Sequence, residues 1–260
     1  MEQELNPQAL IAELGARARR AAALLAGRPT EDKARALRLA ADSLRSSGSA
    51  ILAANASDVA RAEAAGLSPA MLYRLRLDPA RLAGVADGVE AVSRLPDPVG
   101  QVIDSTERPN GLKLSRVRVP IGVIGIIYES RPNVTADAAA LAVMAGDAVI
   151  LRGGSEAMAS NRAIHAAFVA GLEAAGLPGD AAQLVPTTDR AAVGAMLAEL
   201  RRGLDGVAER EVRQRLVRAE RLVGELARGR KLYGHLYDDL LTLKYVHQRY
   251  TNYLRWLESR

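Results

Sequence analysis

The sequence predicts an α/β fold, with a block of N-terminal helices, a β-hairpin, a partial doubly wound parallel sheet and a final helical hairpin. Ala and Leu recur at helical spacing through most of residues 6–95. A turn signal, Pro109-Asn110-Gly111, separates two stretches of extended character. Short apolar runs then alternate with helical stretches of roughly 12–20 residues, a pattern typical of a parallel sheet.

The region before residue 95 is expected to consist of helices only. Apolar periodicity marks LIAELGARARRAAALLAG and DKARALRLAADSLRSS as two of them. Thr30 stands between a proline and two acidic residues, which indicates a helix start with Thr30 as the cap. Further helices are predicted over 49–65, 69–76 and 79–94, and the last two each begin with a capping residue followed by proline.

The pattern changes after residue 99. Strands are predicted over 100–106 and 112–119, which the turn joins as a hairpin. Three later strands should lie side by side in a parallel sheet, about half of the usual nucleotide-binding sheet. They are Val123–Ile127, Ala148–Leu151 and Gln183–Val185. The helices between and after them are expected over 134–145, from about 156 to 175, and from a cap at Asp189 to Leu200.

The last 60 residues differ in composition from the rest. Residues 201–260 hold 14 basic and 8 acidic side chains, whereas the first 200 residues hold 21 and 22. Within 206–258, apolar residues step by four and three, which predicts two helices with heptad seams. We therefore expect a domain over 1–200 and an unrelated basic helical hairpin over 201–260. The hairpin could associate with itself or with a helical partner, and its dispersed arginines favour a solvated face over nucleic-acid binding.

Composition excludes several classes of function. The 260 residues contain no cysteine, which removes disulfides, thiolate metal sites and a cysteine nucleophile. No apolar run approaches the roughly 18–20 residues that span a bilayer, and the N-terminus lacks a signal peptide, so we expect a cytoplasmic protein. His165, His235 and His247 show no metal-ligand spacing, and no metal is expected.

Three polar segments follow the three predicted strands: YESRPN (128–133), RGGSE (152–156) and PTTD (186–189). They should converge at the crevice where parallel sheets bind ligands. In RGGSE, the two glycines would let the backbone approach a ligand, Ser155 could cap the next helix, and Arg152 would suit a phosphate. The alternative is a plain βα turn with a surface arginine. No standard nucleotide-binding fingerprint is present.

Longer stretches carry a family resemblance. PIGVIGIIYESRPNVTADAAAL, GDAVILRGGSEAMASN, LVPTTDRAAVGAML and ILAANASDVARAEAAGLSPAMLYRL together resemble the γ-glutamyl phosphate reductase family, part of the aldehyde dehydrogenase superfamily. The resemblance covers about residues 8–200. It implies the NADPH-dependent reduction of γ-glutamyl phosphate to glutamate 5-semialdehyde in proline biosynthesis. It also implies that the hairpin at 100–119 extends a sheet of a neighbouring subunit.

The resemblance also implies roles for individual residues. Arg152 falls where the superfamily places a basic residue near the adenosine ribose, and Gly153, Gly154, Ser155 and Glu156 fall in the turn beside it. Pro186 and Thr187 fall where the third strand meets the cofactor. Ser130 or Asn133 would lie on the side of the oxyanion, near the nicotinamide.

The chain departs from the family in one decisive respect. The family reaction uses a cysteine thiolate, which lies in a glutamate-glycine-x-cysteine-histidine motif of a later domain, to expel phosphate before hydride transfer. No such motif or cysteine is present. A serine would need an adjacent base, and none is evident. We therefore expect a truncated or diverged reductase that is inactive by itself and binds NADP(H) weakly or not at all. The alternative is a non-catalytic interaction module that uses its C-terminal helices.

Overall fold

The computed structural model describes residues 6–107, 109–111 and 113–205. The helical hairpin predicted within 206–258 lies outside the described residues. The described elements, including two 3₁₀ turns, are α1 (Pro7–Ala26), α2 (Thr30–Ser46), α3 (Gly48–Ala64), α4 (Pro69–Leu75), α5 (Pro79–Val92), β1 (Val102–Glu107), β2 (Lys113–Val117), β3 (Val123–Ile127), α6 (Val134–Met144), β4 (Ala148–Arg152), η1 (Ser155–Ala157), α7 (Met158–Ala174), η2 (Gly179–Ala181), β5 (Ala182–Leu184) and α8 (Ala191–Asp205).

These elements confirm the predicted fold class over the described part of the chain: N-terminal helices, a hairpin and a three-stranded parallel sheet. The last helix, α8, runs through residue 200 to Asp205. The domain division near residue 200 therefore stays a prediction. No helix of the described residues is long and apolar enough to cross a membrane.

Among the first five helices, the caps follow the sequence in two cases and depart from it in a third. Ser68 and Asp78 cap α4 and α5 by accepting backbone N–H groups at 3.4 and 2.7 Å. The prediction that Thr30 caps α2 is wrong, because Thr30 is the first helical residue and Pro29 precedes it without a side-chain cap. The Thr30 hydroxyl instead donates to Asp97 Oδ2 at 2.8 Å, a partner far along the chain.

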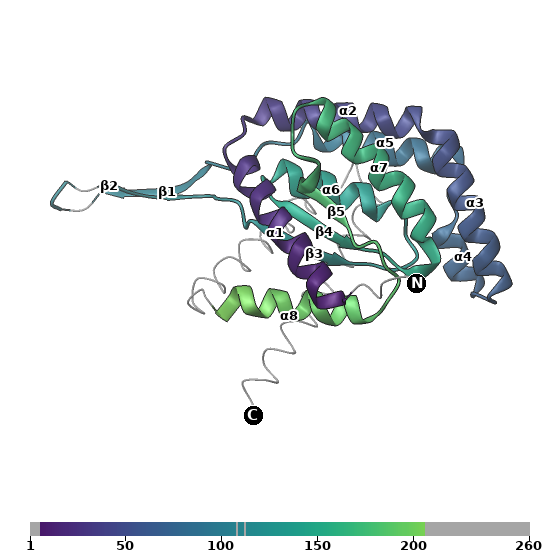
Figure 1. The fold of residues 1–260 in the computed structure, drawn as a ribbon. Coiled ribbons are helices and arrows are strands. Elements are labelled where there is room, and N and C mark those ends of the chain that lie inside the picture. Colours follow the sequence, from purple (N-terminus) through teal and green to yellow (C-terminus); the bar gives the residue numbers. More distant parts are fainter. Residues whose placement is uncertain (1–5, 108, 112, 206–260) are drawn as a thin grey trace.

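The core lies on both faces of the sheet β3-β4-β5. Its strands are parallel, with Ile124 opposite Val149 and Val149 opposite Ala182. All five residues of β4 are buried. Helices α6 and α7, which connect the parallel strands, lie on one face, while α1 and α8, which contact each other, cover the other face (Figure 1).

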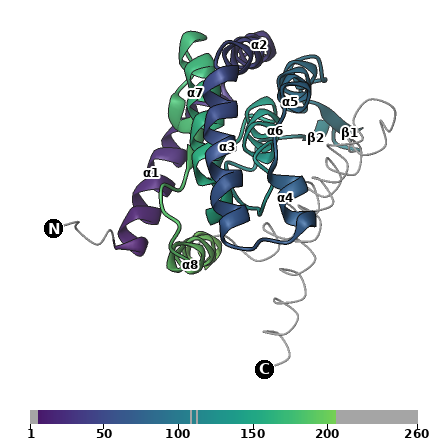
Figure 2. The ribbon, with the colours of Figure 1, turned by 90° about the vertical axis from the view of Figure 1, so that its right-hand side faces the viewer.

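A second layer of helices packs outside the first. Helices α2, α3 and α5 lie against α6 and α7 (Figure 2). Helix α6 is therefore enclosed, and ten of its eleven residues are buried, so it lacks an amphipathic stripe. Helices α2 and α7 approach each other closely at Gly171, where an added Cβ would lie 2.3 Å from the Cα of Ala40.

The β1-β2 hairpin projects from this body (Figure 1). Its strands are antiparallel and every residue in them is exposed. Asp104 pairs with Arg116 across the strands, with Arg116 Nε 2.9 Å from Oδ1, and Ser105 bonds Ser115 at 2.8 Å. Gly111 takes a φ of +81° in the connection, as the predicted turn requires.

The entry to the hairpin is held by a buried ion pair. Lys33 of α2 is 1% exposed, and its Nζ lies 2.6 Å from Asp97 Oδ2 and 3.2 Å from the carbonyl oxygen of Met144, in the last turn of α6. Asp97 also accepts the backbone N–H of Val99 at 2.9 Å. The Lys33 ammonium is thus satisfied by a carboxylate and by a helix C-terminus, where a positive charge is favourable.

The exit from the hairpin is held by a second carboxylate. Asp147 precedes β4, is 2% exposed, and accepts the N–H of Gly122 at 2.6 Å. Burial raises the pKa of Asp147 to about 6, although hydrogen bonds from the backbone of Gly122 and Ile121 and the charge of Lys33 oppose the shift. The ionised form of Asp147 is therefore disfavoured in the folded state.

The helix contact at Gly171 predicts a strong effect of one methyl group. We expect Gly171→Ala to lower the free energy of unfolding by about 3 kcal/mol, because the Cβ meets the backbone of α2. The matched control is Gly84→Ala on α5, where no atom lies within 4 Å of the new Cβ. That substitution should raise the free energy of unfolding by about 0.5–1 kcal/mol. Urea unfolding measures both, and equal effects would contradict the close packing of α2 on α7.

The raised pKa of Asp147 predicts a pH dependence of stability. A carboxyl whose folded pKa lies above its unfolded value contributes most below the unfolded pKa of 3.8, and loses that contribution as pH rises through about 6. Relative to Asp147→Asn, the free energy of unfolding of the wild type should fall by about 2–3 kcal/mol between pH 4 and pH 7. Denaturant unfolding of both proteins across this range measures it, and a difference independent of pH would show that Asp147 does not titrate there.

Candidate functional site

Three turns meet at the carboxyl edge of the sheet, where β3, β4 and β5 end. They are the predicted segments 128–133, 152–156 and 186–189. Parallel pairing sets Ile127 opposite Arg152 and thereby aligns the ends of β3 and β4. Hydrogen bonds from Glu156 and Arg152 join the middle turn to both neighbours. The predicted convergence of the three segments is confirmed.

Arg152 ends β4 and points into the protein. Its side chain is buried, with the residue 7% exposed. Nη1 donates to the carbonyl oxygen of Gly153 at 2.6 Å, and Nη2 donates to that of Thr188 at 2.9 Å. Nε is buried without a hydrogen-bond partner. Arg152 therefore ties the turn after β4 to the turn after β5, and it is not the surface arginine of the plain-turn alternative.

The two glycines of RGGSE leave space that neighbouring side chains occupy. A Cβ on Gly153 would lie 2.1 Å from Nδ2 of Asn161 and 3.1 Å from the ring of Tyr128. A Cβ on Gly154 would lie 2.1 Å from Oε1 of Glu156. Both residues are buried. Their small size thus serves the contacts of this edge, whereas the sequence suggested only room for a ligand.

Glu156 reaches the turn after β3. Its Oε1 accepts the backbone N–H of Ser130 at 2.5 Å and the Ser130 hydroxyl at 2.8 Å. Ser130 is 3% exposed and has a φ of +48°, a region that side-chain-bearing residues rarely adopt. No other non-glycine residue of the described chain has a positive φ. The carboxylate therefore holds a strained residue in place.

The second candidate on the oxyanion side, Asn133, is half-buried just before α6. Its side-chain amide donates to Asp137 Oδ2 at 2.9 Å. Both Ser130 and Asn133 thus have partners within the chain.

A polar chain that the sequence did not single out lies behind this turn. The Tyr128 hydroxyl bonds Thr135 Oγ1 at 2.6 Å, and Thr135 donates to Asn161 Oδ1 at 3.1 Å. Burial raises the pKa of the Tyr128 phenol above its usual value, although the bond to Thr135 and the charge of Arg152 oppose this. These hydrogen bonds connect the end of β3 to α6 and α7. In the sequence, the one sign of them is the tyrosine at the end of an apolar stretch.

Ser155 does not cap α7, contrary to the prediction. Residues 155–157 form a 3₁₀ turn, and α7 begins only at Met158. Asp58, from α3, caps the helix instead by accepting N–H groups of Ala159 at 3.3 Å and Ser160 at 2.7 Å. Asp58 also accepts the Ser160 hydroxyl at 2.6 Å and pairs with Arg61. A distant carboxylate thus replaces the local hydroxyl, and Ser155 is left exposed.

The turn after β5 is more exposed. The carbonyl oxygen of Pro186 accepts Arg162 Nη2 at 2.7 Å, and Thr187 Oγ1 accepts the N–H of Asp189 at 3.1 Å. Asp189 in turn accepts the N–H of Ala191 at 2.8 Å, which confirms it as the cap of α8. Pro186 is exposed and Thr187 is half-buried.

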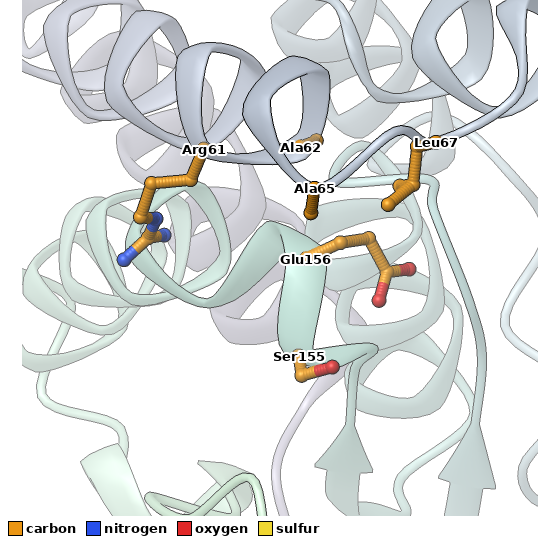
Figure 3. Close-up of a pocket in the computed structure, with 6 residues that line it drawn as sticks. All are labelled: Arg61, Ala62, Ala65, Leu67, Ser155 and Glu156. Carbon is orange, nitrogen blue, oxygen red and sulfur yellow. The ribbon is translucent and has the colours of Figure 1, made fainter.

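A pocket of about 210 Å³ lies beside RGGSE. One wall is the end of α3 with the loop after it, and the other is the 3₁₀ turn. The lining residues are Arg61, Ala62, Ala65, Leu67, Ser155 and Glu156. Figure 3 shows the Arg61 guanidinium and the Glu156 carboxylate pointing away from each other. Sequence reasoning missed this wall, because α3 is far from RGGSE in the chain.

Histidine does not take part in this edge. His165 of α7 places Nε2 2.9 Å from the carbonyl oxygen of Ala182, and burial lowers its pKa. His235 and His247 lie outside the described residues. Among residues 6–205, apart from 108 and 112, no group of three or more His, Cys, Asp or Glu could hold a metal ion.

Comparison with known proteins relates this chain to a family of reductases. No protein-family model matches the chain. The chain is 74% identical over 190 residues to a γ-glutamyl phosphate reductase of Rhizorhabdus wittichii. Over this portion the chain is similar to the γ-glutamyl phosphate reductase family. The match covers 73% of this chain but only 44% of the relative, so the chain spans less than half the length of the curated reductases it matches.

Solved structures agree with this assignment. The crystal structure of γ-glutamyl phosphate reductase from Thermotoga maritima is 40% identical with a TM-score of 0.70, over 72% of this chain and 45% of that chain. An acetylating aldehyde dehydrogenase from Geobacillus thermoglucosidasius, at 14% identity and a TM-score of 0.58, matches 75% of this chain and 41% of that chain. The second likeness establishes the aldehyde dehydrogenase type of fold.

The remote cap of α7 predicts a large loss of stability. Asp58→Ala leaves two backbone N–H groups and the Ser160 hydroxyl without their acceptor in a buried place, and we expect it to lower the free energy of unfolding by about 3 kcal/mol. Asp78→Ala removes an exposed cap of α5 and should cost about 1 kcal/mol. Urea unfolding compares the two, and similar losses would mean that Asp58 is not the cap that holds α7.

Proposed function

We propose that the described residues form part of the NADP(H)-binding region of a γ-glutamyl phosphate reductase. Two observations support this. The sequence is up to 74% identical to reductases of that name, and the three turns meet at the carboxyl edge of a parallel sheet, where such sheets bind nucleotides. The convergence carries the proposal, because it creates a single edge that a cofactor could follow.

Within this proposal, the cofactor lies along the RGGSE turn, residues 152–156, on the side where Ser155 is exposed, and along the turn that begins with Pro186 and Thr187. The geometry suits a sugar or phosphate at Ser155, whose hydroxyl is exposed beside the pocket. The cofactor would supply the hydride when bound. The protein supplies the edge that orients it, and the turn that contains Ser130 and Asn133 would lie on the side of the oxyanion.

The reaction proposed for the family also needs a soft nucleophile. These 260 residues contain no cysteine, and Ser130, the buried serine of the edge, is only 3% exposed and shares the Glu156 oxygen that accepts its hydroxyl with its own backbone N–H. We therefore propose cofactor binding in the cytoplasm, and no reduction of γ-glutamyl phosphate by this chain alone. A thiol contributed by another chain would be needed for the acyl step.

Calorimetric titration of the whole chain with NADPH tests the proposal directly. We expect saturable heat at sub-millimolar to millimolar NADPH, with NADH binding more weakly. The same titrations in the presence of substrate should show no oxidation of NADPH at 340 nm, which serves as the control for activity. The absence of heat at several millimolar of either cofactor would refute cofactor binding.

A charge at Ser155 provides the sharper prediction. Ser155→Asp should weaken NADPH binding about tenfold, because a carboxylate there would repel a phosphate, and NADH binding should weaken less. Ser46→Asp, an equally conservative change at an exposed site on α2, should leave both affinities unchanged. Equal losses for NADPH and NADH with Ser155→Asp would place the 2′-phosphate elsewhere.

A further inference from the structure

We infer that Arg152 and Glu156 are positioning residues that lock the three turns together and do not themselves contact the cofactor. The family resemblance would make both of them cofactor ligands. Their hydrogen bonds indicate a different role. Arg152 donates to the turn after β5, and Glu156 accepts from the turn after β3. RGGSE thus holds its two neighbouring turns together. We call this pair of links the interlock: its Glu156 arm bonds Ser130, and its Arg152 arm bonds Thr188. The inference rests on the proposed function only for its cofactor readout.

The Glu156 arm of the interlock stabilises an unfavourable backbone conformation. Ser130 has a φ of +48°, and both of its donors converge on one oxygen of Glu156. Bonds to an ionised acceptor are stronger than neutral ones, so the carboxylate can offset the strain of a left-handed serine. Without it, Ser130 would relax to negative φ and the turn 128–133 would change direction.

Gly154 is fitted to the same arm. Its missing Cβ is the space that the Glu156 carboxylate occupies, since a Cβ would lie 2.1 Å from one oxygen and 2.4 Å from the other. The carboxylate therefore folds back over the turn that carries it and faces Ser130.

The Arg152 arm is buried and its terminal nitrogens are engaged. Nη1 and Nη2 donate to the carbonyl oxygens of Gly153 and Thr188, and the side chain is shielded from solvent. A phosphate could reach this guanidinium only by breaking the link between two turns. Within RGGSE, Arg152 and Glu156 serve the protein, and the exposed Ser155 is the member that faces outward.

A double-mutant cycle tests the Glu156 arm without a cofactor. Glu156→Ala should lower the melting temperature by about 4–8 °C, because Ser130 loses the acceptor that holds it. Adding Ser130→Gly should recover at least half of that loss, since glycine adopts positive φ without steric cost. Glu63→Ala, which removes an exposed carboxylate paired with Arg76, is the control, and its effect should add to that of Ser130→Gly. Additivity for Glu156 as well would overturn the inference.

Cofactor selectivity tests the Arg152 arm. If Arg152 positions the turns, Arg152→Lys should weaken NADPH and NADH by the same factor, because lysine cannot bond two carbonyl groups at once. If Arg152 binds the 2′-phosphate, Arg152→Gln should weaken NADPH at least tenfold more than NADH, and Arg152→Lys should largely preserve the preference. The control Arg35→Gln removes a bond to the carbonyl oxygen of Ala175, away from the edge, and should alter neither affinity.

The proposed cofactor binding and the positioning role of Arg152 and Glu156 can be refuted independently of each other. If the wild-type chain binds neither nucleotide, the proposed function is refuted and the interlock is decided by the melting temperatures alone. If it binds both, a loss confined to NADPH in Arg152→Gln overturns the positioning role of Arg152. An equal loss of affinity for NADPH and NADH in Arg152→Lys, together with recovery of the melting temperature by Ser130→Gly, supports the interlock.

Discussion

The whole fold depends on close approach between helices and sheet through small side chains. Aromatic residues make up only 3% of the sequence, so volume cannot come from large rings. Alanines fill the core instead, and at Gly171 the backbone of α7 comes against that of α2. Dense packing at such short distances recovers dispersion contacts that larger side chains would otherwise provide. It also makes the arrangement intolerant of added atoms at the contact points.

Apolar packing between small residues does not define one arrangement by itself, and buried polar groups add the missing direction. Asp58 links α3 to α7, Lys33 links α2 to the base of the hairpin, and Arg152 links two turns. Each joins segments that are distant in the sequence, and each would cost free energy if its partner were displaced. These bonds therefore fix where helices and turns lie relative to the sheet.

At the carboxyl edge, the buried polar side chains hold the turns in place and do not provide a reactive group. The edge is assembled from three turns whose side chains Arg152, Ser130 and Glu156 are already hydrogen-bonded within the protein, which suits the orientation of a bound molecule. A nucleophile needs the opposite, an exposed and activated atom, and the described edge offers Ser155 without a base of its own. The described edge thus has the geometry that suits orientation of a bound molecule, and the sequence contains no cysteine that could act as a thiol nucleophile.

The sequence by itself determined the elements, because helical and strand periodicity, turn residues and local caps act over a few neighbours. It predicted β3 and the hairpin turn, and it predicted that three polar turns would share one edge. Only the tertiary structure decided what their side chains do. Ser155 lost its predicted role to Asp58, and Arg152 turned inward to Thr188. Such partners are brought together by packing across more than 30 residues of chain, and no local pattern encodes that distance.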